Sequence, residues 1–145
     1  MLTILVVDDN LQLQIAFKKV LTSSGYRVEL ASNGEEGLRL AHETRPDVIV
    51  LDMLMPKLGG VEVLRTLKKD RKTKTIPVIA LSGLPISNEA KLRRDGAVSY
   101  LQKSRLEDSD VLLQAIDYAL LIPRGDEYSE DSFAPSLLRE AKRLE

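Results

Sequence analysis

The sequence contains no cysteine and no tryptophan, and only 4% of its residues are aromatic. The lack of cysteine excludes disulfide bonds, thiolate metal sites and cysteine nucleophiles, and it is compatible with the reducing cytoplasm, where we expect this protein to act. No apolar run approaches the roughly 18 residues of a membrane-spanning helix. The first three residues also lack the basic start of a secretory signal, so we expect no membrane contact.

An excess of charge of either sign is also lacking. The chain has 21 basic and 22 acidic residues, for a net charge of −1. Proteins that bind nucleic acids need surplus cations to contact phosphates, so we expect no nucleic-acid partner. The 43% of hydrophobic and 30% of charged residues are typical of globular proteins, and 145 residues make one ordinary domain with a little to spare.

Five short apolar runs are spaced along the chain, at residues 4–7, 28–31, 48–51, 78–81 and 97–101. The first, third and fourth are nearly continuous and rich in β-branched residues. That composition is typical of strands buried on both faces of a sheet.

Helical patterns separate these runs. The first helix shows apolar residues at the spacing of one helix face: Leu13, Ala16, Phe17, Val20 and Leu21. Gly25 follows where a left-handed C-terminal cap is expected. Asn33 can cap a second helix, which should end before Pro46 because the residue before a proline avoids the helical conformation.

Three more helices complete the pattern. The third carries Val61, Leu64 and Leu67, the fourth begins near Ser87 or Asn88, and the fifth begins at Asp108 or Ser109 and ends at Pro123. Strands that alternate with helices predict a parallel sheet covered on both faces. With right-handed crossovers, the expected fold is an α/β, doubly wound, five-stranded parallel sheet in the order 2-1-3-4-5.

The pattern divides the chain at residue 122. Residues 1–122 form the predicted domain, and residues 123–145 begin with a polar, turn-rich linker. Residues 136–145 have a weak amphipathic pattern. They form a short C-terminal helix, the start of a downstream domain or a frayed tail, and the sequence leaves these alternatives open.

Polar residues stand at the ends of four predicted strands. Asp8 and Asp9 follow the first strand, Asp52 the third, Ser82 the fourth and Lys103 the fifth. The carboxyl ends of parallel strands lie at one edge of a sheet, where open α/β sheets bind ligands. A single aspartate at a strand end is often only a turn or cap residue, and a single lysine is usually a solvated one. The coincidence of all five predicts a site.

The chemistry of this group can be derived from its residue types. Three carboxylates close together repel one another and favour a bound cation, and oxygen ligands without histidine or cysteine suit Mg²⁺, with Mn²⁺ as an alternative. A carboxylate can act as a nucleophile and form an acyl phosphate. Lys103 would offer a positive charge to phosphoryl oxygens, and Ser82 a hydroxyl donor.

The same residues carry a resemblance to a known family. The matching stretches are residues 4–10 (ILVVDDN), 47–56 (DVIVLDMLMP), 59–60 (GG), 76–83 (IPVIALSG) and 96–103 (GAVSYLQK). In this order and spacing, over roughly residues 1–122, the chain resembles the receiver domain of two-component response regulators, which has a flavodoxin-like fold.

The resemblance implies a role for each site residue. Asp52 resembles the phosphoacceptor, Asp9 a direct Mg²⁺ ligand, and Asp8 a ligand that acts mostly through water. Asp52 and the backbone carbonyl of Leu54 would be further ligands. Lys103 and Ser82 resemble the residues that bind the phosphoryl group.

The resemblance also implies a switch and a set of partners. Ser82 and Tyr100 resemble the pair that moves on phosphorylation and changes the output face. The phosphoryl group would come from a histidine kinase or phosphotransfer protein. A second copy of the chain, or a downstream output protein or domain, would be a further partner. Such a domain promotes its own phosphorylation and dephosphorylation and is a signalling module, not an enzyme.

One residue departs from the family pattern. Proline usually follows the phosphoryl-binding lysine, often after a cis peptide bond, and here Ser104 stands in that place. A cis bond before a residue other than proline costs about 2.5–4 kcal/mol. We therefore expect a trans bond or a looser loop, which leaves the exact setting of Lys103 open but not its presence.

Two alternative functions fit the sequence less well than the signalling module does. A phosphatase of the haloacid-dehalogenase type also forms an aspartyl phosphate, but it places its nucleophile and general acid two residues apart after the first strand, whereas Asp8 and Asp9 are adjacent. A receiver-fold scaffold that acts without phosphorylation would not need the complete set of Asp8, Asp9, Asp52, Ser82 and Lys103.

Overall fold

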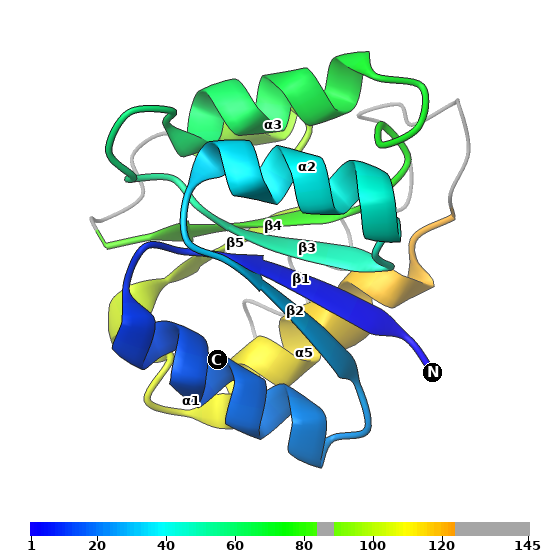
Figure 1. Ribbon diagram of the computed structural model, residues 1–145. Helices are drawn as coiled ribbons and strands as arrows, with labels where there is room; N and C mark the ends of the chain where they lie inside the picture. The colour runs from blue at the N-terminus through cyan, green and yellow to red at the C-terminus, as the bar shows by residue number, and fades with distance from the viewer. Residues whose placement is uncertain (84–88, 124–145) are drawn as a thin grey trace.

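The computed structural model describes residues 1–83 and 89–123, which form a central sheet between two layers of helices (Figure 1). The strands are β1 (Thr3–Val7), β2 (Arg27–Ala31), β3 (Val48–Asp52), β4 (Val78–Ser82) and β5 (Ser99–Gln102). The helices are α1 (Leu11–Ser23), α2 (Gly34–Thr44), α3 (Gly60–Lys69), α4 (Glu89–Arg94) and α5 (Ser109–Leu121), with a short 3₁₀ turn, η1 (Lys103–Arg105), before α5.

Two predictions fall on parts of the chain that the structure does not describe. The predicted start of the fourth helix at Ser87 or Asn88 lies outside the described residues, as do the linker from residue 124 and the short helix over residues 136–145. Among the described residues, none of the helices has the length and apolar character needed to span a bilayer.

The five strands form one parallel sheet in the order β2-β1-β3-β4-β5, which confirms the predicted fold and strand order. The order reverses beside β1, because β2 lies on one side of it and β3 on the other. β1 and β3 are thus the central pair around the switch point, with Val7 opposite Leu51 at their carboxyl ends.

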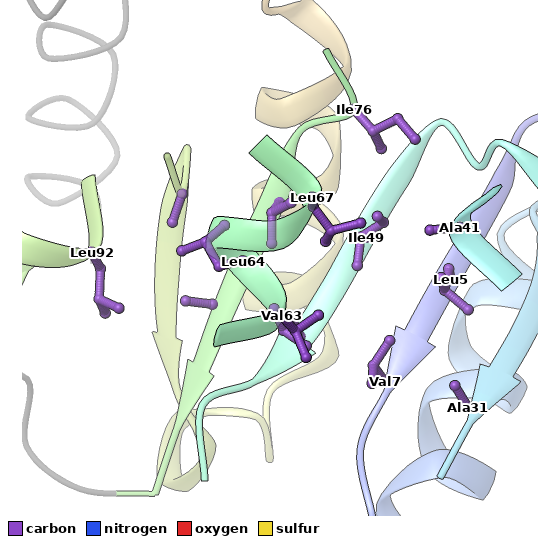
Figure 2. Packing of buried hydrophobic residues seen from close by; sticks show 14 residues of the cluster. Leu5, Val7, Ala31, Ala41, Ile49, Val63, Leu64, Leu67, Ile76 and Leu92 are labelled. Carbon is purple, nitrogen blue, oxygen red and sulfur yellow. The ribbon is translucent and has the colours of Figure 1, made fainter. Parts of the chain in front are cut away.

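Each face of the sheet has its own hydrophobic core. α2 and α3 cover one face, and α1 and α5 cover the other (Figure 1). On the first face, Val63, Leu64 and Leu67 of α3 pack with Ile49 of β3 and with Leu92 of α4 (Figure 2). The strands β1, β3 and β4 are therefore buried from both sides, as their continuous apolar sequences predict.

The ends of the helices follow from local chemistry. Asn10 and Asn33 cap α1 and α2, since each side chain accepts a hydrogen bond from a backbone N–H of the first turn. Gly25 follows α1 with φ +91, a left-handed conformation that costs glycine little. α2 ends at Thr44, before Pro46, as predicted, and Arg45 takes the left-handed cap position.

Two helix faces differ from the predictions. In α1, Ala16 is exposed and Gln14 is buried, and in α3, Val63 is buried whereas Val61 is only partly so. Apolar spacing predicts a helix well, but it does not fix the helix rotation within one residue. The buried Gln14 is possible because its amide finds acceptors at the sheet edge.

Candidate functional site

The site lies at the carboxyl edge of the sheet, around the switch point. Asp8 follows β1 directly, Asp52 is the last residue of β3, and Ser82 is the last residue of β4. Lys103 follows β5 and opens the η1 turn. The structure therefore places these residues, predicted from separate parts of the sequence, at one edge of the sheet.

The end of β3 and the start of α3 approach each other so closely that the position of contact requires glycine. A side-chain Cβ at Gly60 would lie 2.3 Å from the Asp52 carbonyl oxygen and 2.5 Å from the Met53 Cα. Only glycine lets the first turn of α3 approach the end of β3 so closely. The Gly60 N–H also donates to the Met53 carbonyl oxygen at 3.3 Å, which holds the loop after Asp52 against α3.

Three carboxylates meet at this edge. Asp8, Asp9 and Asp52 each offer an oxygen, and these oxygens all lie within 4.8 Å of one another. Asp8 and Asp52 are 0% exposed, whereas Asp9 is exposed. The cluster thus has a buried part inside the sheet edge and one carboxylate open to solvent.

Backbone N–H groups orient the two buried carboxylates. The Asn10 N–H donates to Asp8 Oδ1 at 2.8 Å, and the Leu54 N–H donates to Asp52 Oδ1 at 3.1 Å. Both are turns in which an aspartate side chain binds the backbone two residues on. One oxygen of each carboxylate is held in this way, and the other contacts Lys103.

Lys103 reaches both buried carboxylates. Its Nζ donates to Asp52 Oδ2 at 3.0 Å and forms an ion pair with Asp8 Oδ2 at 3.2 Å. The peptide bond to Ser104 is trans. With Ser104 in place of the usual proline, the lysine still enters the carboxylate cluster.

The local environment shifts two pKa values. Burial raises the pKa of the Asp52 carboxyl group and the nearby charge of Asp8 adds to this, while the Leu54 N–H and Lys103 oppose it. Burial by itself would lower the pKa of Lys103, but the hydrogen bond and negative charge of Asp52, together with Asp8, outweigh burial and raise it. Lys103 is therefore a cation at neutral pH, and the pKa of Asp52 lies above its ordinary value.

The donor set fits a hard divalent cation. Within the described part of the chain, Asp8, Asp9 and Asp52 form a group of oxygen ligands at which one lysine supplies the opposing charge. Asp8 Oδ2 is buried and forms no hydrogen bond of good geometry, and the Lys103 ammonium 3.2 Å away is shared with Asp52, so the buried carboxylates carry more negative charge than this lysine offsets. Oxygen ligands without histidine or sulfur are the kind that Mg²⁺ prefers.

The predicted switch residues lie to one side of this cluster. Ala80 of β4 pairs with Tyr100 of β5, and Ser82 follows Ala80 by two residues. Because side chains alternate along a strand, Ser82 and Tyr100 face the same side of the sheet. Both are partly buried, and Tyr100 packs against the core beneath α3 and α4.

The described apolar residues around the site include three that are unusually exposed. Leu11 and Ile15 of α1 are 67% and 60% exposed, and Leu54, two residues after Asp52, is 59% exposed. Leu11 and Ile15 are four residues apart and so lie on one helix face. The Leu54 side chain is thus part of the surface around the site.

Sequence reasoning missed one polar residue beside the site. Gln14 is 4% exposed, and its amide donates to the backbone carbonyl oxygen of Asp8. Its spacing of three and seven residues from Phe17 and Leu21 was the available signal, because those two define the buried face of α1.

The comparisons with known proteins agree with this geometry. The model of the response regulator receiver domain family matches residues 4–117. The protein PilH of Pseudomonas aeruginosa is 36% identical over 121 residues, which cover 83% of this chain and 98% of PilH. The structure of the chemotaxis protein CheY4 of Vibrio cholerae has a TM-score of 0.76 and 30% identity, and the match covers 83% of this chain and 99% of that one.

A third similar protein is informative about metal binding. The receiver domain of a Pseudomonas aeruginosa sensor histidine kinase, solved with a magnesium ion coordinated in its active site cleft, has a TM-score of 0.74 and 28% identity, and the match covers 82% of this chain and 97% of that one. The family match covers most of the chain, and the fold, the strand order and the acidic group at the sheet edge accord with it. This chain belongs to the response regulator receiver domain family.

Proposed function

We propose that this receiver domain accepts a phosphoryl group on Asp52 from a phosphohistidine of a histidine kinase or phosphotransfer protein. The observation that carries the proposal is the arrangement around Asp52. Its carboxylate is fully buried, one oxygen accepts a hydrogen bond from the Leu54 N–H, and the other lies 3.0 Å from the Lys103 ammonium. Among the described residues, Asp52 is the carboxylate that ends a central strand of the sheet.

The proposed reaction follows from these contacts. An oxygen of Asp52 forms a bond to phosphorus, the bond from phosphorus to the imidazole nitrogen breaks, and that nitrogen keeps the electron pair. The product is an acyl phosphate on Asp52. The raised pKa of Asp52 makes its ionised form a better nucleophile, and Lys103 offsets negative charge on the phosphoryl oxygens.

The acidic group supports a magnesium requirement. Asp8, Asp9 and Asp52, with the backbone carbonyl of Leu54, would hold Mg²⁺, or Mn²⁺ in its place. A bound divalent ion would neutralise charge on the carboxylates and on the incoming phosphoryl group. The buried Asp8 Oδ2, which shares the Lys103 ammonium with Asp52, supports this assignment, as does the magnesium-bound relative of the same fold.

The exposed apolar residues support docking of the phosphodonor at the same edge. Leu11, Ile15 and Leu54 lie on segments that leave the carboxyl ends of β1 and β3, beside Asp8 and Asp52. A protein that delivers its phosphohistidine to Asp52 must cover this edge, and covering exposed leucine and isoleucine side chains favours association.

Intact mass spectrometry with a small phosphodonor and Mg²⁺ tests the proposal. We expect a gain of one phosphoryl group, lost in Asp52→Asn and kept in the matched control Asp110→Asn, whose carboxylate is exposed. Turnover of the donor without a labelled protein would favour the phosphatase alternative. A protein that takes no label with any phosphodonor would favour the scaffold alternative.

Phosphorylation is further proposed to act through Ser82 and Tyr100. Both side chains face the same side of the sheet, and Ser82 ends the strand next to β3, which carries Asp52. Movement of Ser82 toward a phosphoryl oxygen would free space for the Tyr100 ring to turn inward. The face formed by α4, β5 and α5 would then change for an output partner.

Amide hydrogen exchange with and without beryllofluoride tests the switch. We expect slower exchange at the site and altered exchange in α4 and β5 of the wild type. Ser82→Ala should keep the change at the site and lose much of the change beyond it. Ser23→Ala, which alters an exposed serine at the end of α1, is the control. A full wild-type response in Ser82→Ala would exclude this route.

A further inference from the structure

We propose that Gln14 is a positioning residue of the metal site: its side-chain amide fixes the peptide that joins Asp8 to Asp9 and so sets where the Asp9 carboxylate meets a divalent cation. The proposal rests on the proposed function, since it assigns a role toward the same magnesium site.

The contacts of Gln14 are those of a built polar anchor. The side chain is 4% exposed, and its Nε2 lies 2.5 Å from the backbone carbonyl oxygen of Asp8. The same nitrogen lies 3.2 Å from the Ala31 carbonyl oxygen and 3.2 Å from Ser32 Oγ. An amide has two N–H donors for these three acceptors, and the contact with Asp8 is the shortest.

The position of this amide explains why a side chain is needed there. The Asp8 N–H still pairs with the Ala31 carbonyl at 3.0 Å, as the continuation of the ladder between β1 and β2. β2 ends at Ala31, so the sheet supplies no next strand residue to bind the Asp8 carbonyl. The Gln14 side chain therefore donates to the Asp8 carbonyl oxygen the hydrogen bond that a backbone N–H of a longer β2 would have donated.

The carbonyl of Asp8 determines the course of the chain into Asp9. The Asp8 carbonyl and the Asp9 N–H belong to one planar peptide unit, which also includes the Cα of Asp9. A hydrogen bond that orients this carbonyl therefore orients the Asp9 Cα. Asp9 is exposed, so packing around its side chain does not hold it in place.

The buried carboxylate of Asp8 has supports of its own. Its Oδ1 accepts a hydrogen bond from the Asn10 N–H, and its Oδ2 faces Lys103. Loss of the Gln14 amide should thus disturb Asp9 more than the Asp8 carboxylate. Partners that orient metal ligands are typically worth about 10–100-fold in metal affinity, and we expect an effect near the lower end.

Magnesium titration by calorimetry, without a phosphodonor, tests the proposal on the full chain. Gln14→Met keeps the length of the side chain and removes its donors, and we expect it to raise the Mg²⁺ dissociation constant about tenfold. Gln12→Met, an exposed position of the same helix, is the matched control. Ser32→Ala removes one acceptor without touching Asp8. Both should bind Mg²⁺ as the wild type does.

A second measurement separates positioning from general support of the fold. At saturating Mg²⁺, the rate of Asp52 labelling in Gln14→Met should approach the wild-type rate. The variant should differ only in needing a higher Mg²⁺ concentration to reach half of the maximal rate. Gln14→Asn, whose amide is one methylene too short to reach Asp8, should show the same shift and serves if Gln14→Met does not fold.

The outcomes distinguish the two proposals. A wild type that binds Mg²⁺, beside folded Gln14 variants that bind it equally well, overturns the role of Gln14 and leaves the proposed function standing. A rate that stays low at saturating Mg²⁺ also overturns it, because the defect then lies elsewhere. A wild type that binds no Mg²⁺ overturns the metal site itself and the role of Gln14 with it.

Discussion

Lys103→Met should destabilise the metal-free protein, because it leaves two buried carboxylates without their cation. The Lys103 Nζ lies 3.0 Å from Asp52 Oδ2 and 3.2 Å from Asp8 Oδ2, and both aspartates are 0% exposed. Methionine keeps most of the apolar stem of lysine. The substitution therefore tests the ammonium group more than the packing around it.

The contact distances give the scale of the effect. At an effective dielectric constant of about 20, each of these ion contacts is worth roughly 5 kcal/mol before desolvation is subtracted. The net loss should be smaller, since a buried pair broken by removal of one partner typically costs about 3–5 kcal/mol. We expect the free energy of unfolding to fall by about 3 kcal/mol at pH 7, because proton uptake by Asp52 limits the loss.

The pH dependence of this loss has a definite sign. The folded-state pKa of Asp52 is already raised by burial, so Asp52 contributes stability that is present below its unfolded pKa and is lost as the pH rises through the folded value. Removal of Lys103 raises that folded pKa further, since the lysine lowers it in the wild type. The deficit of Lys103→Met should therefore shrink as the pH is lowered from 7 toward 5.

Urea denaturation followed by circular dichroism, with a chelator present, measures this deficit. The exposed Lys72 gives the matched control Lys72→Met, which should change the free energy of unfolding by no more than about 0.5 kcal/mol. In an Asp52→Asn background, Lys103→Met should cost clearly less than in the wild type. An equal cost in both backgrounds, or a cost that grows as the pH falls, would refute the reasoning.

Three further predictions concern other parts of the molecule. Burial lowers the pKa of Lys68 from 10.5 to about 8, so the unfolded state binds more protons than the folded state above pH 8. The free energy of unfolding, measured in urea melts, should therefore rise from pH 8 to 9.5, and in Lys68→Met it should not change over this range. Gly60→Ser should lower the free energy of unfolding by about 3 kcal/mol through contact with the end of β3, whereas Gly59→Ser, with open space around its Cβ, should not. In magnesium titrations, Asp9→Asn should weaken Mg²⁺ binding more than Asp8→Asn does. In urea melts, Asp8→Asn should stabilise the metal-free protein, because it removes repulsion between carboxylates.

Much of the fold could be predicted because its signals are local. Ile49 to Leu51 and Val78 to Leu81 are continuous apolar runs of strand length, and the spacing between runs leaves room for one helix each. Parallel strands then bring the ends of β1, β3, β4 and β5 to one edge. The shared location of Asp8, Asp52, Ser82 and Lys103 follows from topology alone, without any knowledge of side-chain contacts.

The finer geometry could not be predicted, because it depends on rotations that topology leaves open. The apolar pattern does not determine that Val63 is buried in place of Val61, since a small rotation of α3 exchanges them. It also does not reveal that Lys103 lies between Asp8 and Asp52 rather than against one of them. The burial of Gln14 needs the end of β2 and the Asp8 carbonyl to be known together.

The charge balance of the site connects its stability with its proposed chemistry. Three carboxylates and one lysine at one edge of the sheet leave an excess of negative charge, and two of those carboxylates are fully buried. The hydrophobic cores on both faces must offset this cost, since like charges held together destabilise the folded chain. A divalent cation relieves the repulsion and would also prepare Asp52 to receive a negatively charged phosphoryl group. The residues that the fold can least easily accommodate are thus the ones that a cation and a phosphodonor would use.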